Sequence, residues 1–380
     1  YNYVFDPRVY LKRFFQYNGG DYTFLIDEAH NLVDRAREMF SAEITKRSFL
    51  QLRKKYKDSN TKLYKALGKV NAAMLEMRKK CDEKGHYIQS EEPKEIYDLL
   101  RGFTKEAETL LSQNMDSEDH SELLELYYSA LGFLRIAEFY DDRYVTYLER
   151  YRSDVKLKIF CLDPSFRLQE ALLRGKSAIF FSATLTPMEY FRDVLGGDDK
   201  DYRMTLASPF DEDKLCLLIA NRISTRYINR EKSYGEIARY IYEVITKKIG
   251  NYLVFFPSYK YMDEVLAIFE ERYQYIKTLV QSRDMTEEER EIYLEKFEPL
   301  AGKQLLGFAV LGGIFSEGID LKGDRLLGTI IVGVGLPQIC LERNIISDYF
   351  KKKNGLGYEY AYMYPGMNKV LQAAGRVIRS

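Results

Sequence analysis

The spacing of apolar residues divides the chain into segments of two kinds. Short apolar runs bounded by polar residues predict buried strands, whereas apolar residues that recur every three or four positions predict helices with one buried face. Such runs lie at 22–26, 156–161, 177–181, 215–219, 252–256, 307–311 and 328–334, and helical repeats lie at 233–248, 259–272 and 286–297. Strands that alternate with helices are typical of parallel sheets in doubly wound α/β proteins.

The stretch from about 31 to 153 departs from this alternation because its pattern is helical. Three apolar stripes run through it, and the first is typical of a coiled-coil seam. They consist of Leu63, Leu67, Val70, Met74, Met77 and Cys81; of Ile96, Leu99, Phe103, Ala107 and Leu110; and of Leu124, Tyr127, Leu131, Leu134 and Ala137. We therefore expect an all-helical insert at 46–153, a first α/β domain at 1–45 and 154–210, and a second at 211–380, with the hinge at 208–210.

The composition of the chain indicates the cellular compartment but says little about the function. Lys+Arg and Asp+Glu both number 57 among 380 residues, so only local patches can form a track for nucleic-acid phosphates. Cys81, Cys161, Cys216 and Cys340 are widely separated and have no histidine at ligand spacing, which predicts free thiols in a reducing compartment. No apolar run approaches the length of a membrane span. We expect a cytoplasmic protein, and the Lys- and Tyr-rich composition suggests a bacterial source.

The most informative short stretch is FLIDEAHNL, residues 24–32. Its apolar residues run directly into two adjacent acids, Asp27 and Glu28, and His30 follows. In open α/β sheets ligands bind at the carboxyl ends of strands, where these acids stand. One carboxylate can hold a Mg²⁺ that bridges nucleotide phosphates, and the second can orient or deprotonate an attacking water. DEAH therefore indicates a nucleotide site, with a solvated turn after a strand as the plainer interpretation.

Later segments favour the nucleotide site by their order. They are FSATLTP at 181–187, LVFFPSY at 253–259, GGIFSEGID at 312–320 and QAAGRVIRS at 372–380. In the last of them, Gln372, Arg376 and Arg379 would share one face of a helix. Two guanidinium groups directed toward one cleft suit a polyphosphate, because each offers a fork of hydrogen-bond donors.

Together these segments resemble the motifs of superfamily 2 helicases, specifically those of the XPD/DinG type. The resemblance runs from motif II (DEAH) through motif III (SATL), motif IV (LVFFPSYKYM) and motif V (GGIFSEGIDLKG) to motif VI (QAAGRVIR), and it leaves out only the insert. It implies two RecA-like parallel-sheet domains, the first incomplete, with an Arch domain at the insert. It also implies an ATP-dependent DNA helicase that moves 5′→3′ on single-stranded DNA.

The resemblance also implies roles for residues of the first domain. Asp27 would coordinate the Mg²⁺ of ATP, Glu28 would activate the hydrolytic water, and His30 would report the state of the phosphates to the rest of the molecule. Ser182 and Thr184 of motif III would link the nucleotide to the DNA.

In the second domain, the resemblance assigns Arg376 and Arg379 as arginine fingers with Gln372 nearby, and Gly318 and Asp320 as residues that approach the nucleotide. The residues expected to contact the DNA backbone are Ser258 and Ser316.

Single-stranded DNA would cross both RecA-like domains and pass under the Arch, held by backbone contacts and aromatic stacking. Two basic triplets of the insert are candidates for lining that opening, although solvated helix faces are the plainer interpretation. The triplets are Lys54, Lys55 and Lys57, and Arg78, Lys79 and Lys80.

The chain departs from the family pattern in one respect. It contains no glycine-rich phosphate loop, because its Gly175-Lys176-Ser177 lies between a helix and a strand, which is the wrong order. We expect that loop, and the four cysteines of the family's iron–sulfur cluster, upstream of Tyr1, and we expect residues 1–380 alone to hydrolyse ATP poorly.

Two other functions remain open. A helicase relative without a phosphate loop would bind single strands or a partner protein without catalysis, and an RNA-directed DEAH ATPase would share motif II. The presence of Asp27, Glu28, Arg376 and Arg379 argues against the non-catalytic relative. The amino-acid sequences of motifs IV and V argue against the RNA-directed ATPase.

Overall fold

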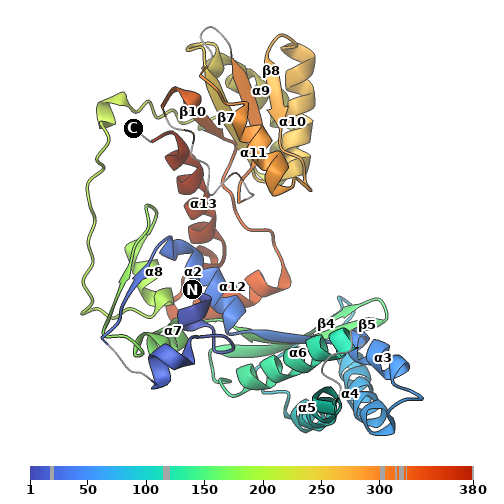
Figure 1. Ribbon diagram of the computed structural model, residues 1–380. Helices are drawn as coiled ribbons and strands as arrows, with labels where there is room; N and C mark the ends of the chain where they lie inside the picture. Colours follow the sequence, from blue (N-terminus) through green and yellow to red (C-terminus); the bar gives the residue numbers. More distant parts are fainter. Residues whose placement is uncertain are drawn as a thin grey trace. The chain divides into compact units, whose positions relative to one another are not determined.

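The computed structural model describes residues 1–17, 21–113, 120–299, 304–312, 315, 321 and 323–378 (Figure 1). The chain forms two compact units. Unit 1 comprises Tyr1–Ser182 and Glu189–Asp201, and unit 2 comprises Ala183–Met188 and Tyr202–Ser380. The domain boundaries that we predicted from the sequence stay predictions, and each unit is described by itself.

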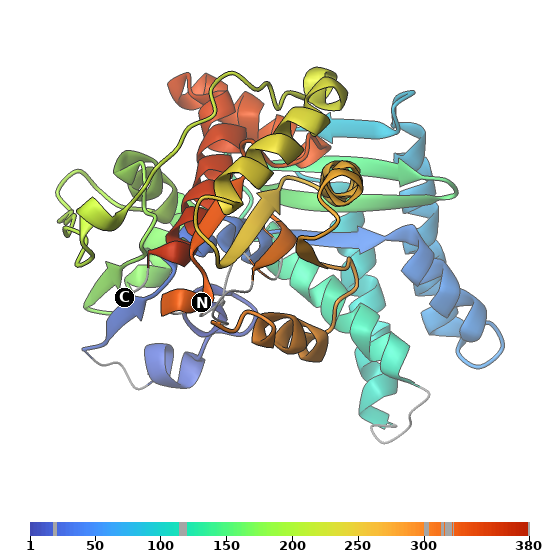
Figure 2. The same cartoon turned by 90° about the horizontal axis from the view of Figure 1, so that it is seen from above.

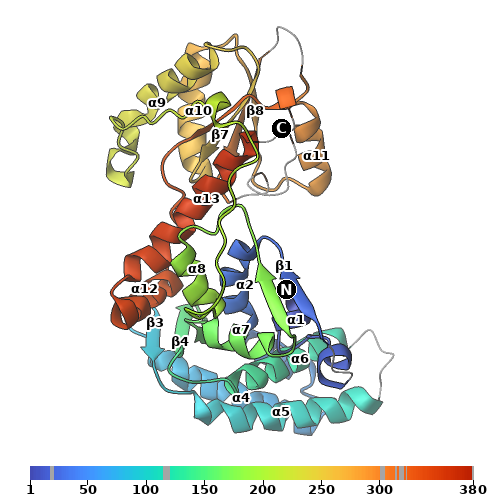
Figure 3. The same cartoon turned by 90° about the vertical axis from the view of Figure 1, so that its left-hand side faces the viewer.

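Unit 1 contains a parallel pair of strands, β1 (Thr23–Ile26) and β6 (Ser177–Phe180), which lie side by side in Figure 3. Phe24 and Ile26 are buried, whereas Leu25 is 68% exposed, so one face of β1 is covered among the described residues. The helices of this part are α1 (Asn2–Phe5), α2 (Leu32–Met39), α7 (Ser165–Leu172) and α8 (Met188–Leu195). The parallel pairing predicted from the two apolar runs is confirmed.

The rest of unit 1 combines helices with an antiparallel sheet. The sheet has the order β2 (Ala42–Thr45), β5 (Asp154–Cys161), β4 (Tyr144–Tyr151) and β3 (His86–Gln89), and helices lie along it in Figure 2. The expectation of an all-helical insert at 46–153 is therefore wrong, because β3 and β4 lie inside it. The two long strands pair along their whole length, which supplies the backbone hydrogen bonds that isolated short strands lack.

The helices of this stretch agree with the first two apolar stripes, but the third prediction is wrong. These helices are α3 (Lys46–Lys55), α4 (Thr61–Lys79), α5 (Lys94–Gln113) and α6 (Ser121–Ala137), and each packs against the next. The seam of α4 is buried at every core position from Leu63 to Met77. Asn60 caps α4 by accepting a hydrogen bond from the amide of Leu63 at 3.0 Å.

The buried residues of α6 stand one position before the predicted ones, and Leu124 and Leu131 are exposed. The buried set is Leu123, Leu126, Ala130, Phe133 and Ile136.

Unit 2 is built on a four-stranded parallel sheet of order β10-β7-β9-β8. The strands are β7 (Asn251–Phe256), β8 (Lys277–Val280), β9 (Leu305–Val310) and β10 (Gly328–Ile331). The main helices are α9 (Arg230–Ile245), α10 (Tyr259–Arg272), α11 (Glu287–Glu295), α12 (Leu341–Asn354) and α13 (Tyr364–Ala374). β7 and β9 are buried along their whole length, as expected for central strands covered on both faces.

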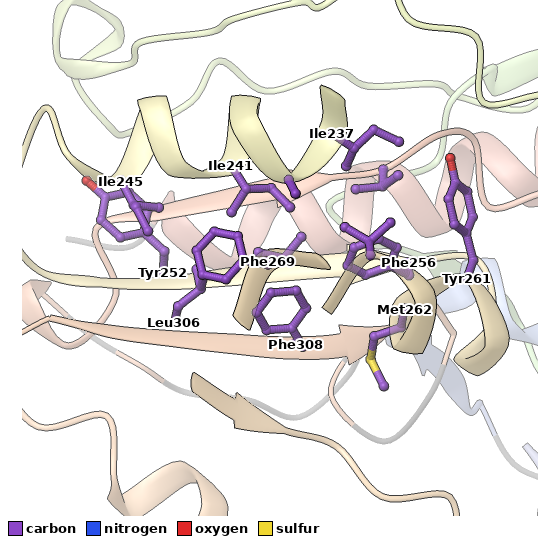
Figure 4. Close-up of a cluster of buried hydrophobic side chains, with 14 of the residues drawn as sticks. Ile237, Ile241, Ile245, Tyr252, Phe256, Tyr261, Met262, Phe269, Leu306 and Phe308 are labelled. Atoms are coloured by element: carbon purple, nitrogen blue, oxygen red, sulfur yellow. The ribbon is translucent and has the colours of Figure 1, made fainter. Parts of the chain in front are cut away.

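Alternate residues of β7 enter different hydrophobic clusters. Val254 and Phe256 pack with α9 and α10 in the cluster of Figure 4, whereas Leu253 and Phe255 belong to a second cluster with Tyr293 of α11. In Figure 3, α9 and α10 lie on one side of the sheet and α11 on the other. The doubly wound arrangement predicted for this part of the chain is thus confirmed.

One predicted strand of unit 2 is absent. Residues 215–219 form no strand, and the side chains of Leu217 and Ile219 are 74% and 78% exposed. A five-residue apolar run specifies a strand only where another strand offers it a hydrogen-bonding partner, and this segment pairs with none among the described residues. The strand expected at 328–334 also ends early, at Ile331.

Candidate functional site

The acids after β1 stand in a left-handed turn. Glu28 has φ 47° and ψ 42°, and its amide donates a hydrogen bond to Oδ1 of Asp27 at 2.7 Å. The next amide, of Ala29, donates to the carbonyl of Phe181 beyond β6 at 3.1 Å. A left-handed conformation in a residue other than glycine costs about 1 kcal/mol or more, so the surrounding contacts must hold it. Both carboxylates are exposed, as a ligand site requires.

Tyr1 supplies one of these contacts. Its hydroxyl lies 2.8 Å from the carbonyl oxygen of Asp27 and 2.6 Å from that of Glu28, and one O–H is shared between the two acceptors. The phenol therefore bridges the two peptide groups of the turn. Sequence reasoning missed Tyr1, because a tyrosine 26 residues upstream of a motif carries no periodic signal.

A triangle of polar atoms joins motif II to motif III. Oγ of Ser182 lies 2.8 Å from Nδ1 of His30 and 3.2 Å from Oε2 of Glu28, and the same Nδ1 and Oε2 atoms are 3.2 Å apart. His30 is buried and Glu28 is exposed, so the triangle connects the interior of unit 1 to its surface. The structure thus brings together three residues to which the resemblance assigned roles in one mechanism, although Glu28 and Ser182 are 154 positions apart in the sequence.

The donor set around Asp27 fits a magnesium ion. Among the described residues no three His, Cys, Asp or Glu side chains gather into a metal cage. Mg²⁺ rarely uses such a cage, because it keeps several waters and is held by one or two carboxylates together with substrate phosphates. An exposed carboxylate at the carboxyl end of a parallel strand meets that requirement.

Motif VI lies at the end of α13 in unit 2. Nε2 of Gln372 donates a hydrogen bond to Oγ1 of Thr184, a residue of motif III that belongs to the same unit. Arg376 is 6% exposed and stands in a 3₁₀ turn, Gly375–Val377, that follows the helix. The expectation that Gln372 and Arg376 share the face of one continuous helix is therefore wrong, because α13 ends at Ala374. Arg379 lies outside the described residues.

The other site residues predicted for unit 2 divide into two groups. Ser258 is the N-cap of α10, where its Oγ accepts a hydrogen bond from the amide of Tyr261 at 3.4 Å. Its hydroxyl thus has a structural role at the first turn of a helix. The remaining predicted positions, Ser316, Gly318 and Asp320, lie outside the described residues.

The two basic triplets stand in the last turns of α3 and α4 or just beyond them, where positive charge complements the helix dipole. Several of these side chains have partners within unit 1. Lys79 pairs with Glu76 at 2.7 Å, Lys80 pairs with Glu95 at 3.3 Å, and Arg78 donates to the carbonyl of Arg152 at 2.7 Å. These contacts agree with the plainer interpretation of solvated helix faces.

Two general expectations can be compared with the structure. Cys81 and Cys161 are buried, Cys216 and Cys340 are exposed, and all four are free thiols. In the part of the chain that the structure describes, no helix is long and apolar enough to cross a membrane.

The comparisons with known proteins all find similarity to helicases. A family model described as a helicase C-terminal domain matches residues 241–380. The chain is 25% identical over 398 residues to the ATP-dependent DNA helicase XPD of Sulfolobus acidocaldarius, covering 100% of this chain and 66% of that protein. It is also 25% identical over 280 residues to the XPD helicase subunit of general transcription and DNA repair factor IIH of Arabidopsis thaliana, covering 66% and 34% respectively.

The fold has relatives among solved structures. Xpd4 of S. tokodaii superimposes with a TM-score of 0.60 at 15% identity, covering 100% of this chain and 74% of that one. The chain thus spans from a third to two thirds of the length of these curated relatives. They come from a plant and an archaeon, so the expectation of a bacterial source is not supported.

Proposed function

Because the chain belongs to the XPD-type superfamily 2 helicases, we propose that the full-length protein is an ATP-dependent DNA helicase that moves 5′→3′ on single-stranded DNA. The observation that carries the proposal is the triangle of Glu28, His30 and Ser182. In this triangle Glu28, the carboxylate that would orient the water, is hydrogen-bonded to Ser182 of motif III, the segment that would transmit the state of the nucleotide.

In the proposed reaction, Glu28 orients the water that attacks the γ-phosphate of ATP. Asp27 holds the Mg²⁺, which when bound neutralises charge on the β- and γ-phosphates. His30 keeps the Glu28 carboxylate in place through the 3.2 Å contact between Nδ1 and Oε2. When the γ-phosphate leaves, the hydrogen bonds of Ser182 to these two side chains rearrange, and the chain after Ser182 moves with them.

Unit 2 contributes the remaining groups of the proposal. Arg376 and Arg379 stabilise charge on the transferred phosphoryl group, an effect worth several kcal/mol of barrier in such enzymes. Gln372 transmits the change through Thr184, its hydrogen-bond partner. Gly318 and Asp320 approach the nucleotide, and Ser258 and Ser316 contact the backbone of the DNA.

We also propose that residues 1–380 by themselves hydrolyse ATP only slowly. The one Gly-Lys-Ser sequence, at 175–177, leads from α7 into β6 rather than from a strand into a helix. A phosphate loop needs the opposite order, because its amides and the helix N-terminus together hold the phosphates. An iron–sulfur cluster, if the full-length protein holds one, uses cysteines other than the four separated thiols of this chain.

The proposal is tested by strand displacement with the full-length protein. Duplexes with a 5′ or a 3′ single-stranded tail, made of DNA or of RNA, are mixed with protein, ATP and Mg²⁺. We expect unwinding of the 5′-tailed DNA duplex alone. Preference for RNA tails would identify an RNA-directed ATPase, and tight binding without ATP hydrolysis on any substrate would identify a non-catalytic relative.

A further inference from the structure

A hydrogen-bonded network at the carboxyl edge of the unit 2 sheet is centred on Gln281. This residue follows β8 and is 3% exposed. Its backbone amide donates to the carbonyl of Phe308 and its Oε1 accepts from the amide of Val310, both at 2.9 Å, so both bonds tie it to β9. Its Nε2 donates to the hydroxyl of Tyr259, also at 2.9 Å. Every polar group of this amide side chain thus has a fixed partner.

The network fixes the ring of Tyr259. Its hydroxyl accepts from Gln281 and donates to the carbonyl of Ser282 at 3.3 Å, so the phenol is held at both its donor and its acceptor positions. Burial raises the pKa of Tyr259, which keeps the hydroxyl protonated and able to donate at neutral pH. Tyr259 is the first residue of α10, directly after its N-cap Ser258.

The ring supports an exposed cation. Cζ of Arg283 lies 5.4 Å from the centroid of the Tyr259 ring, within the range of a cation–π contact. Among the described residues, no carboxylate forms an ion pair with Arg283. A guanidinium that lies beside a ring and forms no ion pair keeps N–H groups available to a ligand. The sheet therefore presents a positioned fork of donors at its carboxyl edge, where α/β sheets bind their ligands.

We propose that Arg283 contacts one backbone phosphate of the single-stranded nucleic acid, and that Gln281 is a positioning residue that acts through Tyr259. The inference rests on the proposed function and adds to it a contact that none of the helicase motifs predicts. A phosphodiester is the ligand because its two oxygens match the guanidinium fork. The positive end of the 14-residue helix α10, beside Tyr259, favours the same charge.

The experiment measures the affinity of the full-length protein for a fluorescein-labelled oligo-dT by anisotropy at a series of KCl concentrations. Arg283→Gln should weaken binding about three- to tenfold at low salt and reduce the salt slope by about 0.7, the value for one phosphate on a single strand. Arg283→Lys keeps the charge and should retain the slope. Tyr259→Phe removes both hydrogen bonds of the hydroxyl but keeps the ring, and should weaken binding by a smaller factor.

Arg239→Gln is the matched control. Arg239 also stacks on a tyrosine, with Cζ 5.1 Å from the ring of Tyr240, but it lies within α9 and pairs with Glu243 at 2.9 Å. Its loss should leave both affinity and slope unchanged.

The outcomes separate the inference from the proposed function. Wild-type protein that does not bind oligo-dT overturns both. Wild-type protein that binds, with Arg283→Gln indistinguishable from Arg239→Gln, overturns the inference and leaves the helicase proposal standing. A weaker Arg283→Gln with an unchanged salt slope also overturns it, because a lost phosphate contact must change the slope.

Discussion

At the scale of single residues, the position of the Glu28 carboxylate depends on a backbone conformation that its own side chain does not favour. The left-handed turn is stabilised from three sides, by Oδ1 of Asp27, by the hydroxyl of Tyr1 and by the carbonyl of Phe181, which follows β6. Ser182 and His30 then fix the direction of the side chain. The sequence predicts the acids and the serine because they stand in motifs, but the turn that orients them exists only through contacts from residues far along the chain.

Replacing Tyr1 by phenylalanine tests whether this support matters for catalysis. The change removes one hydroxyl that serves two carbonyl acceptors, so the turn should sample other conformations. In the full-length protein, we expect kcat for ATP hydrolysis to fall about three- to tenfold while the affinity for DNA stays unchanged. Tyr3→Phe is the control, because Tyr3 lies in α1, the helix whose N-cap is Tyr1, and is 66% exposed. Equal kcat values for the two variants would show that Tyr1 has no positioning role.

The thiols offer a residue-scale test of burial. Burial raises the pKa of Cys161 to about 12 and also raises that of Cys81, so little thiolate exists at pH 8 in either case. Cys216 and Cys340 are exposed. We expect a thiol reagent to modify the exposed pair in native protein and Cys161 only after unfolding, as read by peptide mass mapping. Rapid native modification of Cys161 would contradict the packing of β5.

At the scale of elements, the sequence predicts best where local signals agree. The helix expected at 259–272 is found with those bounds, because Ser258 caps it and Pro257 precedes it. α11 begins at a complete capping box of Thr286 and Glu289. The antiparallel sheet of unit 1 was missed, because β2 and β3 have four residues each and become strands only through their long-range partners β5 and β4.

The central strands of unit 2 should dominate the stability of that unit. Phe308 of β9 is fully buried and its ring lies 6.0 Å from Phe256 and 5.9 Å from Phe269. Phe308→Ala should lower the free energy of unfolding by about 3–5 kcal/mol, measured by urea denaturation. Ile292→Ala, on the exposed side of α11, should change it by about 0.5 kcal/mol or less. Similar effects of the two changes would contradict the two-faced core.

At the scale of the whole molecule, each of the two units holds part of the residue set proposed for ATP hydrolysis. Unit 1 holds Asp27, Glu28 and His30, and unit 2 holds Gln372 and Arg376. Motif III is divided between them: Ser182 contacts Glu28 and His30 of unit 1, and Thr184 contacts Gln372 of unit 2. The sequence assigns both Ser182 and Thr184 to the first domain and does not predict the contact between Thr184 and Gln372. Residues 316–320 of motif V lie outside the described residues.

The most direct test of this account is DNA-stimulated ATP hydrolysis, measured side by side for the full-length protein, its Glu28→Gln variant and the 380-residue chain. We predict hydrolysis that rises with single-stranded DNA in the full-length protein and falls at least about a hundredfold in Glu28→Gln, because the carboxylate that orients water is lost. The 380-residue chain should hydrolyse ATP as slowly as that variant. A Glu28→Gln variant as active as the wild type, or a full-length protein inactive with every DNA, would contradict the account.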